Sequence, residues 1–179
     1  MSRIIAVIGT AGRDKSIKML PRHWGQMAEV IFNEVKAEDV LVSGGAAWAD
    51  HVAVWAYLND YVKGLILHLP APFNGTHFDG GYGTSGGACN YYHGLFSDLM
   101  GFNSRMHIQA AIEKGAITTS QPIAAGYGAM AVRNKAVARD CTHMIAFTFG
   151  EGDVPADGGT KITWDMAATK QRIHVPIVR

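Results

Sequence analysis

Short apolar runs alternate with amphipathic segments along most of this chain. Ile4-Ile5-Ala6-Val7-Ile8 is continuously apolar and stops at Gly9, which is typical of a strand covered on both faces. Shorter apolar runs predict further strands over 40–42, 65–69, 144–147 and 173–178. Apolar residues at helical spacing predict helices over about 20–35, 48–59, 104–114, 126–139 and 160–170. This alternation predicts an α/β fold built on a parallel sheet.

The order of the strands follows from the handedness of parallel crossovers, which leaves few arrangements for five strands. We expect a Rossmann-like open parallel sheet of about five strands in the order 3-2-1-4-5, numbered along the chain, with helices on both faces. Pro176 lies in the last strand and has no N–H to donate, so this strand is expected at an edge. Residues 1–179 are expected to form a single domain.

Residues 73–103 break the alternation. The segment is dense in glycine and has no sustained helical or strand period, and its aromatic residues are Phe73, Phe78, Tyr82, Tyr91, Tyr92, Phe96 and Phe102. A structureless loop of this length is uncommon, so we expect an insertion that acts as a lid, an oligomer contact or a partly disordered segment. A surface insertion packed by its own aromatic side chains is the alternative. In a lid, Tyr82, Tyr91 and Tyr92 would stack on a bound base.

Composition narrows the class of protein. With 179 residues and 48% hydrophobic content the chain can form a stable core without disulfides, so Cys89 and Cys141 are expected to be reduced thiols. The chain has no apolar run of membrane-spanning length and no signal peptide, which predicts a cytoplasmic protein without a membrane partner. The formal net charge is +1, whereas non-specific nucleic-acid binding needs a dense basic face, so nucleic acid is not expected as a partner, although a local groove for a single strand stays open.

Three glycine-containing turns fall where a predicted strand gives way to a helix. They are Gly9-Thr10-Ala11-Gly12-Arg13, Ser43-Gly44-Gly45 and Gly158-Gly159-Thr160. A helix N-terminus has unpaired N–H groups and a partial positive charge, and glycine lets an anion approach it closely. In a parallel sheet these turns converge at the carboxyl ends of the strands. The sequence therefore predicts a crevice for a phosphorylated small molecule, with a nucleotide as the expected ligand.

These turns, together with two further segments, resemble the SLOG superfamily. The strand followed by Gly9–Arg13, the run Ser43-Gly44-Gly45-Ala46-Ala47-Trp48-Ala49-Asp50, the helical segment Met130–Asn134 and the turn Gly158–Thr160 occur in the order found there. That superfamily contains Rossmann-like nucleotide-binding proteins related to LOG phosphoribohydrolases and to the DNA-processing protein DprA. The likeness is closest to the YspA-type branch, with its Ser-Gly-Gly-x-x-x-Ala-Asp pattern. It covers residues 3–70 and 125–178 and omits the insertion.

The resemblance implies roles for two charged residues. Arg133 matches the arginine that contacts substrate in LOG-type enzymes, with Asn134 in place of the lysine that often follows it. Arg133 also lies on an apolar helical stripe, where a buried guanidinium needs an anionic partner: a ligand phosphate, or an ion pair with Asp140 or Asp50. Asp50 near a helix start is favoured by the helix dipole alone, or it binds a ligand ribose.

The predicted ligand-binding residues combine the turns with this pair. They are Gly9, Thr10, Ala11, Arg13, Ser43, Gly44, Gly45, Asp50, Arg133, Asn134, Gly158, Gly159 and Thr160. The histidines show no pair at metal spacing with a third ligand nearby, so no metal and no cofactor is expected. The exposed aromatic surface predicted for the insertion, and the habit of SLOG-like proteins of pairing through helices, lead us to expect a homodimer or higher homo-oligomer.

The catalytic residue of the resembled enzymes is missing. LOG-type enzymes have a glutamate three residues after the threonine of their glycine turn, and Thr163 stands at that position here. Threonine cannot replace a carboxylate as a general acid or base. Asp165 points away on the helix, whereas Glu151, Asp153 and Asp157 could supply a relocated carboxylate. We therefore expect a protein that senses or sequesters a nucleotide or a nucleotide-derived signal; the alternative is a nucleoside 5'-monophosphate N-glycosidase whose catalytic residue is unknown.

Overall fold

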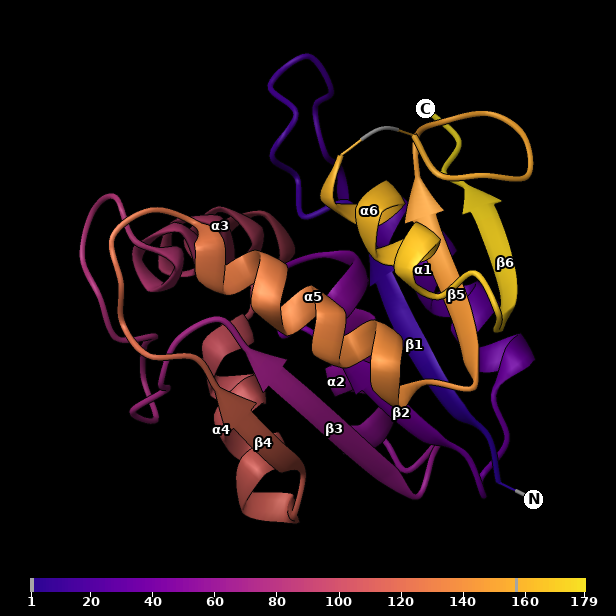
Figure 1. Cartoon of the computed structure of the whole chain (residues 1–179), viewed down its shortest axis with the longest axis horizontal. Helices are drawn as coiled ribbons and strands as arrows, with labels where there is room; N and C mark the ends of the chain where they lie inside the picture. The colour runs from indigo at the N-terminus through magenta and orange to yellow at the C-terminus, as the bar shows by residue number, and fades with distance from the viewer. Residues whose placement is uncertain (1, 157) are drawn as a thin grey trace.

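The computed structural model describes residues 2–156 and 158–179 and contains a six-stranded parallel sheet (Figure 1). The strands are β1 (Ile4–Gly9), β2 (Val40–Ser43), β3 (Gly64–Leu69), β4 (Ile117–Ser120), β5 (His143–Thr148) and β6 (Gln171–Pro176). The helices are α1 (Pro21–Glu34), α2 (Ala49–Leu58), α3 (Ser85–Met100), α4 (Ser104–Lys114), α5 (Gly128–Asp140) and α6 (Gly159–Met166). The predicted α/β class with an open parallel sheet is confirmed.

The strand order is β4-β3-β2-β1-β5-β6. The five predicted strands lie in the predicted order, and Pro176 is in the edge strand β6, as expected. The opposite edge strand, β4, was missed. Its residues Ile117-Thr118-Thr119-Ser120 are all exposed. A strand without a buried face needs neither an apolar run nor an alternation of apolar and polar residues, so the sequence carries no strand signal here.

Successive residues of β1 face opposite sides of the sheet and therefore enter two separate cores. Ile5 and Val7 pack with α1 and α2, whereas Ala6 and Ile8 pack with residues of α5 and α6. Figure 1 shows α5 and α6 in front of the sheet, with α1 and α2 behind it. The strand is thus covered on both faces, which is why its sequence is continuously apolar.

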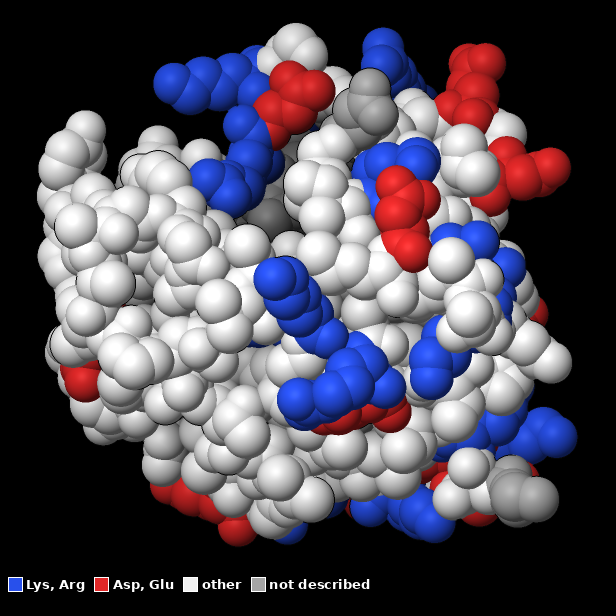
Figure 2. Space-filling view, in the orientation of Figure 1, with Lys and Arg blue, Asp and Glu red and all other residues white. Residues whose placement is uncertain are grey.

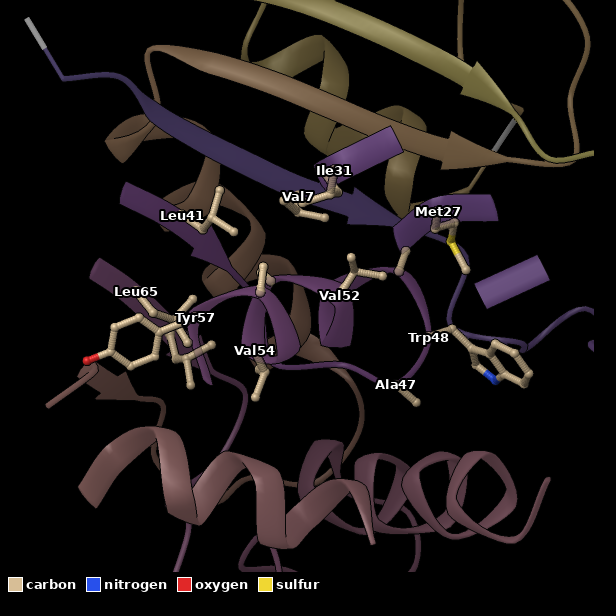
Figure 3. Close-up of a cluster of buried hydrophobic side chains, with 14 of the residues drawn as sticks. Val7, Met27, Ile31, Leu41, Ala47, Trp48, Val52, Val54, Tyr57 and Leu65 are labelled. Carbon is tan, nitrogen blue, oxygen red and sulfur yellow. The ribbon is translucent and has the colours of Figure 1, made fainter. Parts of the chain in front are cut away.

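Helix α2 is buried along nearly its whole length because it lies between the sheet and α4, with α1 beside it. In Figure 3, Val52 and Val54 leave this helix on opposite sides, and Val52 lies near Val7 and Met27. A helix that is covered all round needs apolar residues all round, and α2 has them. This packing fixes the start of α2, where Asp50 lies.

The prediction that residues 73–103 lack a helix is wrong, because α3 is a helix of sixteen residues. Thr84 caps its N-terminus by accepting a hydrogen bond from the Gly87 N–H, and Gly101 ends it with φ of 75°. A Cβ at Gly86 would lie 1.9 Å from the Asp79 carbonyl oxygen. Glycine in the first turn therefore lets the preceding loop cross the helix closely, and this use of glycine hid the helical pattern from the sequence.

The aromatic residues of this segment divide between the core and the surface. Phe78 and Phe96 are completely buried, whereas Tyr82 is fully exposed and Tyr91 is 62% exposed. Among the described residues, no helix is long and apolar enough to span a bilayer.

Candidate functional site

A cavity of about 460 Å³ opens at the carboxyl ends of β1 and β5, beside α5 and the start of α6. In Figure 2, lysine and arginine side chains stand beside a hollow near the top of the view. The predicted residues that line the cavity are Gly9, Thr10, Ala11, Arg13, Gly44, Asp50, Arg133, Asn134, Gly158, Gly159 and Thr160. Ser43 and Gly45 do not line it.

Arg133 is the buried cation of this cavity, and its side chain is 9% exposed. Its Nη1 donates a hydrogen bond to the Gly44 carbonyl, and its Nε donates to Oδ1 of Asn134 over 3.1 Å. Among the described residues, Nη2 has no hydrogen-bond partner and no carboxylate forms an ion pair with Arg133. Two of the three guanidinium nitrogens are thus used by the protein, and the third is available to a ligand.

The alternative in which Arg133 forms an ion pair with Asp140 or Asp50 is not found among the described residues. Asp140 instead accepts a hydrogen bond from His68 over 2.8 Å and pairs with Arg139 over 2.6 Å. The Arg139 hydrogen bonds lower the pKa of the Asp140 carboxyl below its ordinary value. Asp140 therefore belongs to a separate polar group at the end of α5 and does not pair with Arg133.

Asp50 lies in the first turn of α2 and its side chain reaches back to the turn that follows β2. Its Oδ2 accepts hydrogen bonds from the N–H groups of Gly44, over 3.1 Å, and Ala46, over 3.3 Å. Ser43 Oγ accepts from the Gly45 N–H over 3.4 Å and donates to the Asp50 carbonyl over 3.2 Å. These N–H groups of the turn are therefore engaged within the protein and are not free for a ligand.

Burial raises the pKa of the Asp50 carboxyl, and the charge of Arg133 and the hydrogen bonds from Ala46 and Gly44 oppose this shift. The carboxyl is 5% exposed and lines the cavity. Its hydrogen bonds hold the turn in place. The alternative role of Asp50, a favourable interaction with the helix dipole alone, does not account for these hydrogen bonds.

The glycines of the first two turns are required by the protein's own packing. A Cβ at Gly44 would lie 2.7 Å from Cζ of Arg133, and a Cβ at Gly9 would lie 2.4 Å from the Phe147 carbonyl oxygen. Gly45 has φ of 67°, and its Cβ would lie 2.5 Å from Cδ2 of Leu69. Sequence reasoning assigned these glycines to the approach of a ligand, which stays a prediction; in the structure they also allow a side chain and neighbouring backbone to approach.

The third turn is different because its first glycine has open space beside it. Gly158 has φ of 128° and open space where a Cβ would project, and no side chain of residues 2–156 or 158–179 accepts a hydrogen bond from the first N–H groups of α6. Gly158, Gly159 and Thr160 all line the cavity. Thr163 Oγ1 donates to the Gly159 carbonyl over 2.8 Å, so this hydroxyl is used within the helix. An uncapped N-terminus beside a buried arginine is a suitable environment for an anion.

The carboxylates that line the cavity among the described residues are Asp14 and Asp50. Glu151 and Asp153 are exposed and do not line it, and Asp157 lies outside the described residues. Asp165 accepts hydrogen bonds from Lys161 on the outer surface of α6. Of the loop carboxylates expected to replace the missing glutamate, neither described one reaches the cavity.

Tyr127 is a cavity residue that the sequence did not indicate. Of the tyrosines predicted for a lid, Tyr82 and Tyr91 do not line the cavity, and Tyr92 lies near Arg13, 5.5 Å from its ring centre to Cζ. Tyr127 follows Gly126 and precedes α5, the helix that carries Arg133. The signal that the sequence offered for Tyr127 was its position between Gly126 and Gly128, at the start of this helix.

Three histidines lie together behind the turn that follows β2. His93 places Nε2 3.0 Å from the Gly45 carbonyl oxygen and Nδ1 2.8 Å from Ser104 Oγ, and His51 Nε2 lies 3.1 Å from Nδ1 of His107. Burial lowers the pKa of His93 to about 4 and that of His51 well below its ordinary value. In the described residues, no group of three metal-ligating side chains is placed to hold an ion.

The chain is 31% identical over 183 residues to the uncharacterized protein R261 of Acanthamoeba polyphaga mimivirus. The match covers 96% of this chain and 94% of the viral protein. The chain belongs to the same family as this viral protein. No family model matches the chain.

Two solved structures of DNA processing protein A (DprA) share the fold. The Streptococcus pneumoniae protein matches with a TM-score of 0.61 at 18% identity over 98% of this chain, and the Helicobacter pylori protein with 0.60 at 17% over 97%. The chain spans 50% and 65% of the lengths of these two proteins. This likeness confirms a DprA-like, Rossmann-type fold, which is the structural part of the SLOG resemblance.

The expectation that excluded nucleic acid as a partner is wrong. The H. pylori DprA protein, which has this fold, binds single-stranded DNA. A formal net charge near zero describes the whole chain and not the local surface around a groove, so it does not exclude a nucleic-acid ligand.

Proposed function

We propose that this protein binds a nucleotide, with the phosphate held between Arg133 and the N-terminus of α6. The observation that carries this proposal is the Nη2 of Arg133, which lacks a partner among the described residues in a side chain only 9% exposed. A buried guanidinium favours an anion, and a charge-assisted hydrogen bond to phosphate would use this nitrogen. The motif order of the SLOG superfamily, including its LOG and YspA-type branches, supports the same ligand class.

The size of the cavity fits a small ligand. Its volume of about 460 Å³ lies within the range of small-molecule sites, roughly 300–1,000 Å³. Its lining combines polar groups with apolar residues such as Ile17, Met130 and Ile162. This combination suits a ligand that has both a phosphate and a less polar ring.

The role that fits these residues best is to hold the nucleotide without cleaving it, as a sensor or a sequestering protein. Thr163 replaces the expected glutamate and its hydroxyl is bonded to the Gly159 carbonyl. Asp50 is committed to the turn after β2 through two N–H groups. Loss of a catalytic carboxylate removes transition-state stabilisation but leaves ground-state phosphate contacts intact.

The alternative is hydrolysis of the N-glycosidic bond, and one observation favours it. Asp50 lines the cavity, and burial raises the pKa of its carboxyl, which is the property that a general acid needs. Incubation with adenosine monophosphate, followed by chromatography, distinguishes the two functions. Free adenine and ribose 5-phosphate would show hydrolysis, whereas recovery of intact nucleotide would support binding alone.

Titration calorimetry with adenosine monophosphate tests the binding site. Arg133→Ala should weaken binding about thirtyfold, or about 2 kcal/mol, because it removes a charge-assisted hydrogen bond to phosphate. Arg139→Ala is the matched control, since Arg139 lies on the same helix but pairs with Asp140 outside the cavity. Equal affinity in the wild type and Arg133→Ala would disprove the proposed phosphate site.

A single strand of DNA is a second candidate ligand. The H. pylori protein of the same fold binds single-stranded DNA, and the loop after β1 carries exposed Arg13, Lys15 and Lys18 beside the cavity. Fluorescence anisotropy of a labelled oligothymidine tests this candidate, and affinity should fall steeply with salt if phosphates are bound. Competition by adenosine monophosphate would place both ligands in one cavity. Absence of any anisotropy change at low salt would disprove the candidate.

A further inference from the structure

Arg13 and Tyr127 form a cation–π contact at the edge of the cavity. The Arg13 Cζ lies 5.6 Å from the ring centre of Tyr127 and 5.5 Å from that of Tyr92. Arg13 Nη1 also lies 3.4 Å from Sδ of Met130. Arg13, Tyr127 and Met130 all line the cavity, so this contact belongs to the same space as Arg133.

The ring of Tyr127 is not explained by packing. It is 51% exposed, although its backbone is fixed on both sides. The Gly126 N–H donates to the Gly83 carbonyl over 2.8 Å, and Tyr127 serves as the N-cap residue of α5 without a side-chain hydrogen bond. A half-exposed aromatic ring on an anchored backbone at a cavity presents a flat apolar surface to whatever enters.

Arg13 adds a second planar group to this surface. Among the described residues, it forms no ion pair with a carboxylate, and the side chain is exposed. A guanidinium plane stacks on aromatic rings and on nucleobases alike. The pair therefore offers an aromatic face and a movable cationic face, a combination that favours a planar ring with delocalised electrons.

We propose that Tyr127 and Arg13 form the subsite for the base of the bound nucleotide, with the base stacked on the Tyr127 ring and covered by the Arg13 guanidinium. This subsite rests on the proposed function, because it assigns the phosphate to Arg133 and the base to the tyrosine. It replaces the stacking role predicted for Tyr82, Tyr91 and Tyr92, which lie outside the cavity lining. Stacking does not read the edge of a base, so adenine and uracil are both accepted, and adenine, the larger ring, binds more tightly.

Two ligands that differ only by the base test the subsite. Adenosine monophosphate and ribose 5-phosphate share the phosphate and the sugar, so their affinity ratio measures the contribution of the base. We expect the wild type to bind adenosine monophosphate about tenfold more tightly than ribose 5-phosphate, because stacking of one base on an aromatic ring contributes about this much to affinity. Tyr127→Leu should remove most of this ratio and leave the affinity for ribose 5-phosphate unchanged. Tyr127→Phe should retain it.

Tyr82→Leu is the control, because Tyr82 is fully exposed and does not line the cavity. It should change neither affinity. Equal binding of the two ligands by wild type, or an equal loss of both in Tyr127→Leu, would overturn the subsite while leaving the phosphate site intact. If neither ligand binds wild type, the proposed function fails and the base subsite fails with it.

Discussion

The Cβ that Gly44 lacks would lie 2.7 Å from Cζ of Arg133. The guanidinium therefore packs directly on the backbone of the turn after β2, where it also donates to the Gly44 carbonyl. This contact joins α5 to the turn and sets the position of Nη2 in the cavity.

Gly44→Ala should displace the guanidinium and weaken binding of adenosine monophosphate about tenfold, or about 1.4 kcal/mol, through loss of the positioned charge. Calorimetry measures this effect directly. Gly25→Ala is the control, since a Cβ at Gly25 in α1 meets nothing within 4 Å. That change should leave affinity unchanged and stabilise the fold by roughly 0.5–1 kcal/mol. Unaltered affinity in Gly44→Ala would show that the position of Arg133 does not matter for the ligand.

Asp50→Ala should lower the free energy of unfolding by about 2–3 kcal/mol, because it leaves the N–H groups of Gly44 and Ala46 buried without an acceptor. Urea denaturation measures this change. Asp165→Ala, which removes a surface pair with Lys161, should stay within about 0.5 kcal/mol of the wild type. A purely ligand-binding Asp50 would instead leave the unfolding free energy unchanged and reduce affinity alone.

Stability should fall as the pH is lowered from about 6.5 to about 4. Burial lowers the pKa of His93 from 6.5 to about 4, so the folded state holds this ring neutral while the unfolded chain takes up a proton. Above pH 6.5 the neutral His93 makes its full contribution to the free energy of unfolding. This contribution declines as the pH falls below 6.5 and is lost near pH 4, which lowers the free energy of unfolding by roughly 3 kcal/mol at most. His51, with its lowered pKa, acts in the same direction.

Urea denaturation at several pH values measures this dependence, and His93→Gln provides the comparison. Glutamine can donate to the Gly45 carbonyl in place of the histidine Nε2 and does not titrate. The decline between pH 6.5 and 4 should therefore be shallower in the variant. Identical slopes in both proteins would show that His93 does not cause the acid sensitivity.

The prediction of a homodimer directs attention to α3. Tyr91, Leu95 and Leu99 follow one another at four-residue spacing and are 62%, 49% and 40% exposed, which gives one apolar stripe on the surface of the helix. We expect light scattering to give about twice the chain mass of 19.3 kDa, and Leu95→Glu to give the monomer. A wild-type mass of one chain at micromolar concentration would contradict the prediction.

The sequence predicted the sheet well because strands covered on both faces need continuous apolar runs, as Ile4–Ile8 shows. It missed β4, whose exposed residues carry no such requirement. It also missed α3, where Gly86 and Gly87 serve close packing with the 79–82 segment and weaken the helical pattern. Both omissions have the same cause, which is the lack of a periodic pattern of apolar residues. In β4 the strand is exposed, and at the start of α3 glycines replace larger side chains where another backbone segment crosses.

For the site, the sequence predicted which residues gather at the cavity better than it predicted the contacts that they make. Arg133 and the turn at Gly158 line the cavity as expected, because the carboxyl ends of parallel strands converge there. The acceptor of the Gly44 N–H could not be predicted, since it is a side chain six residues away that turns back over the loop. Tyr127 was missed because its position depends on the contact between Gly126 and Gly83, which are distant in the sequence.

The carboxyl of Asp50 is a built-in hydrogen-bond acceptor for the turn after β2. Because this acceptor is part of the chain, the turn is held without a ligand, and a ligand does not have to order it on arrival. Association should then be limited by diffusion and by access to the cavity instead of by loop rearrangement. For the proposed nucleotide, the turn after β2 therefore adds no slow ordering step to binding.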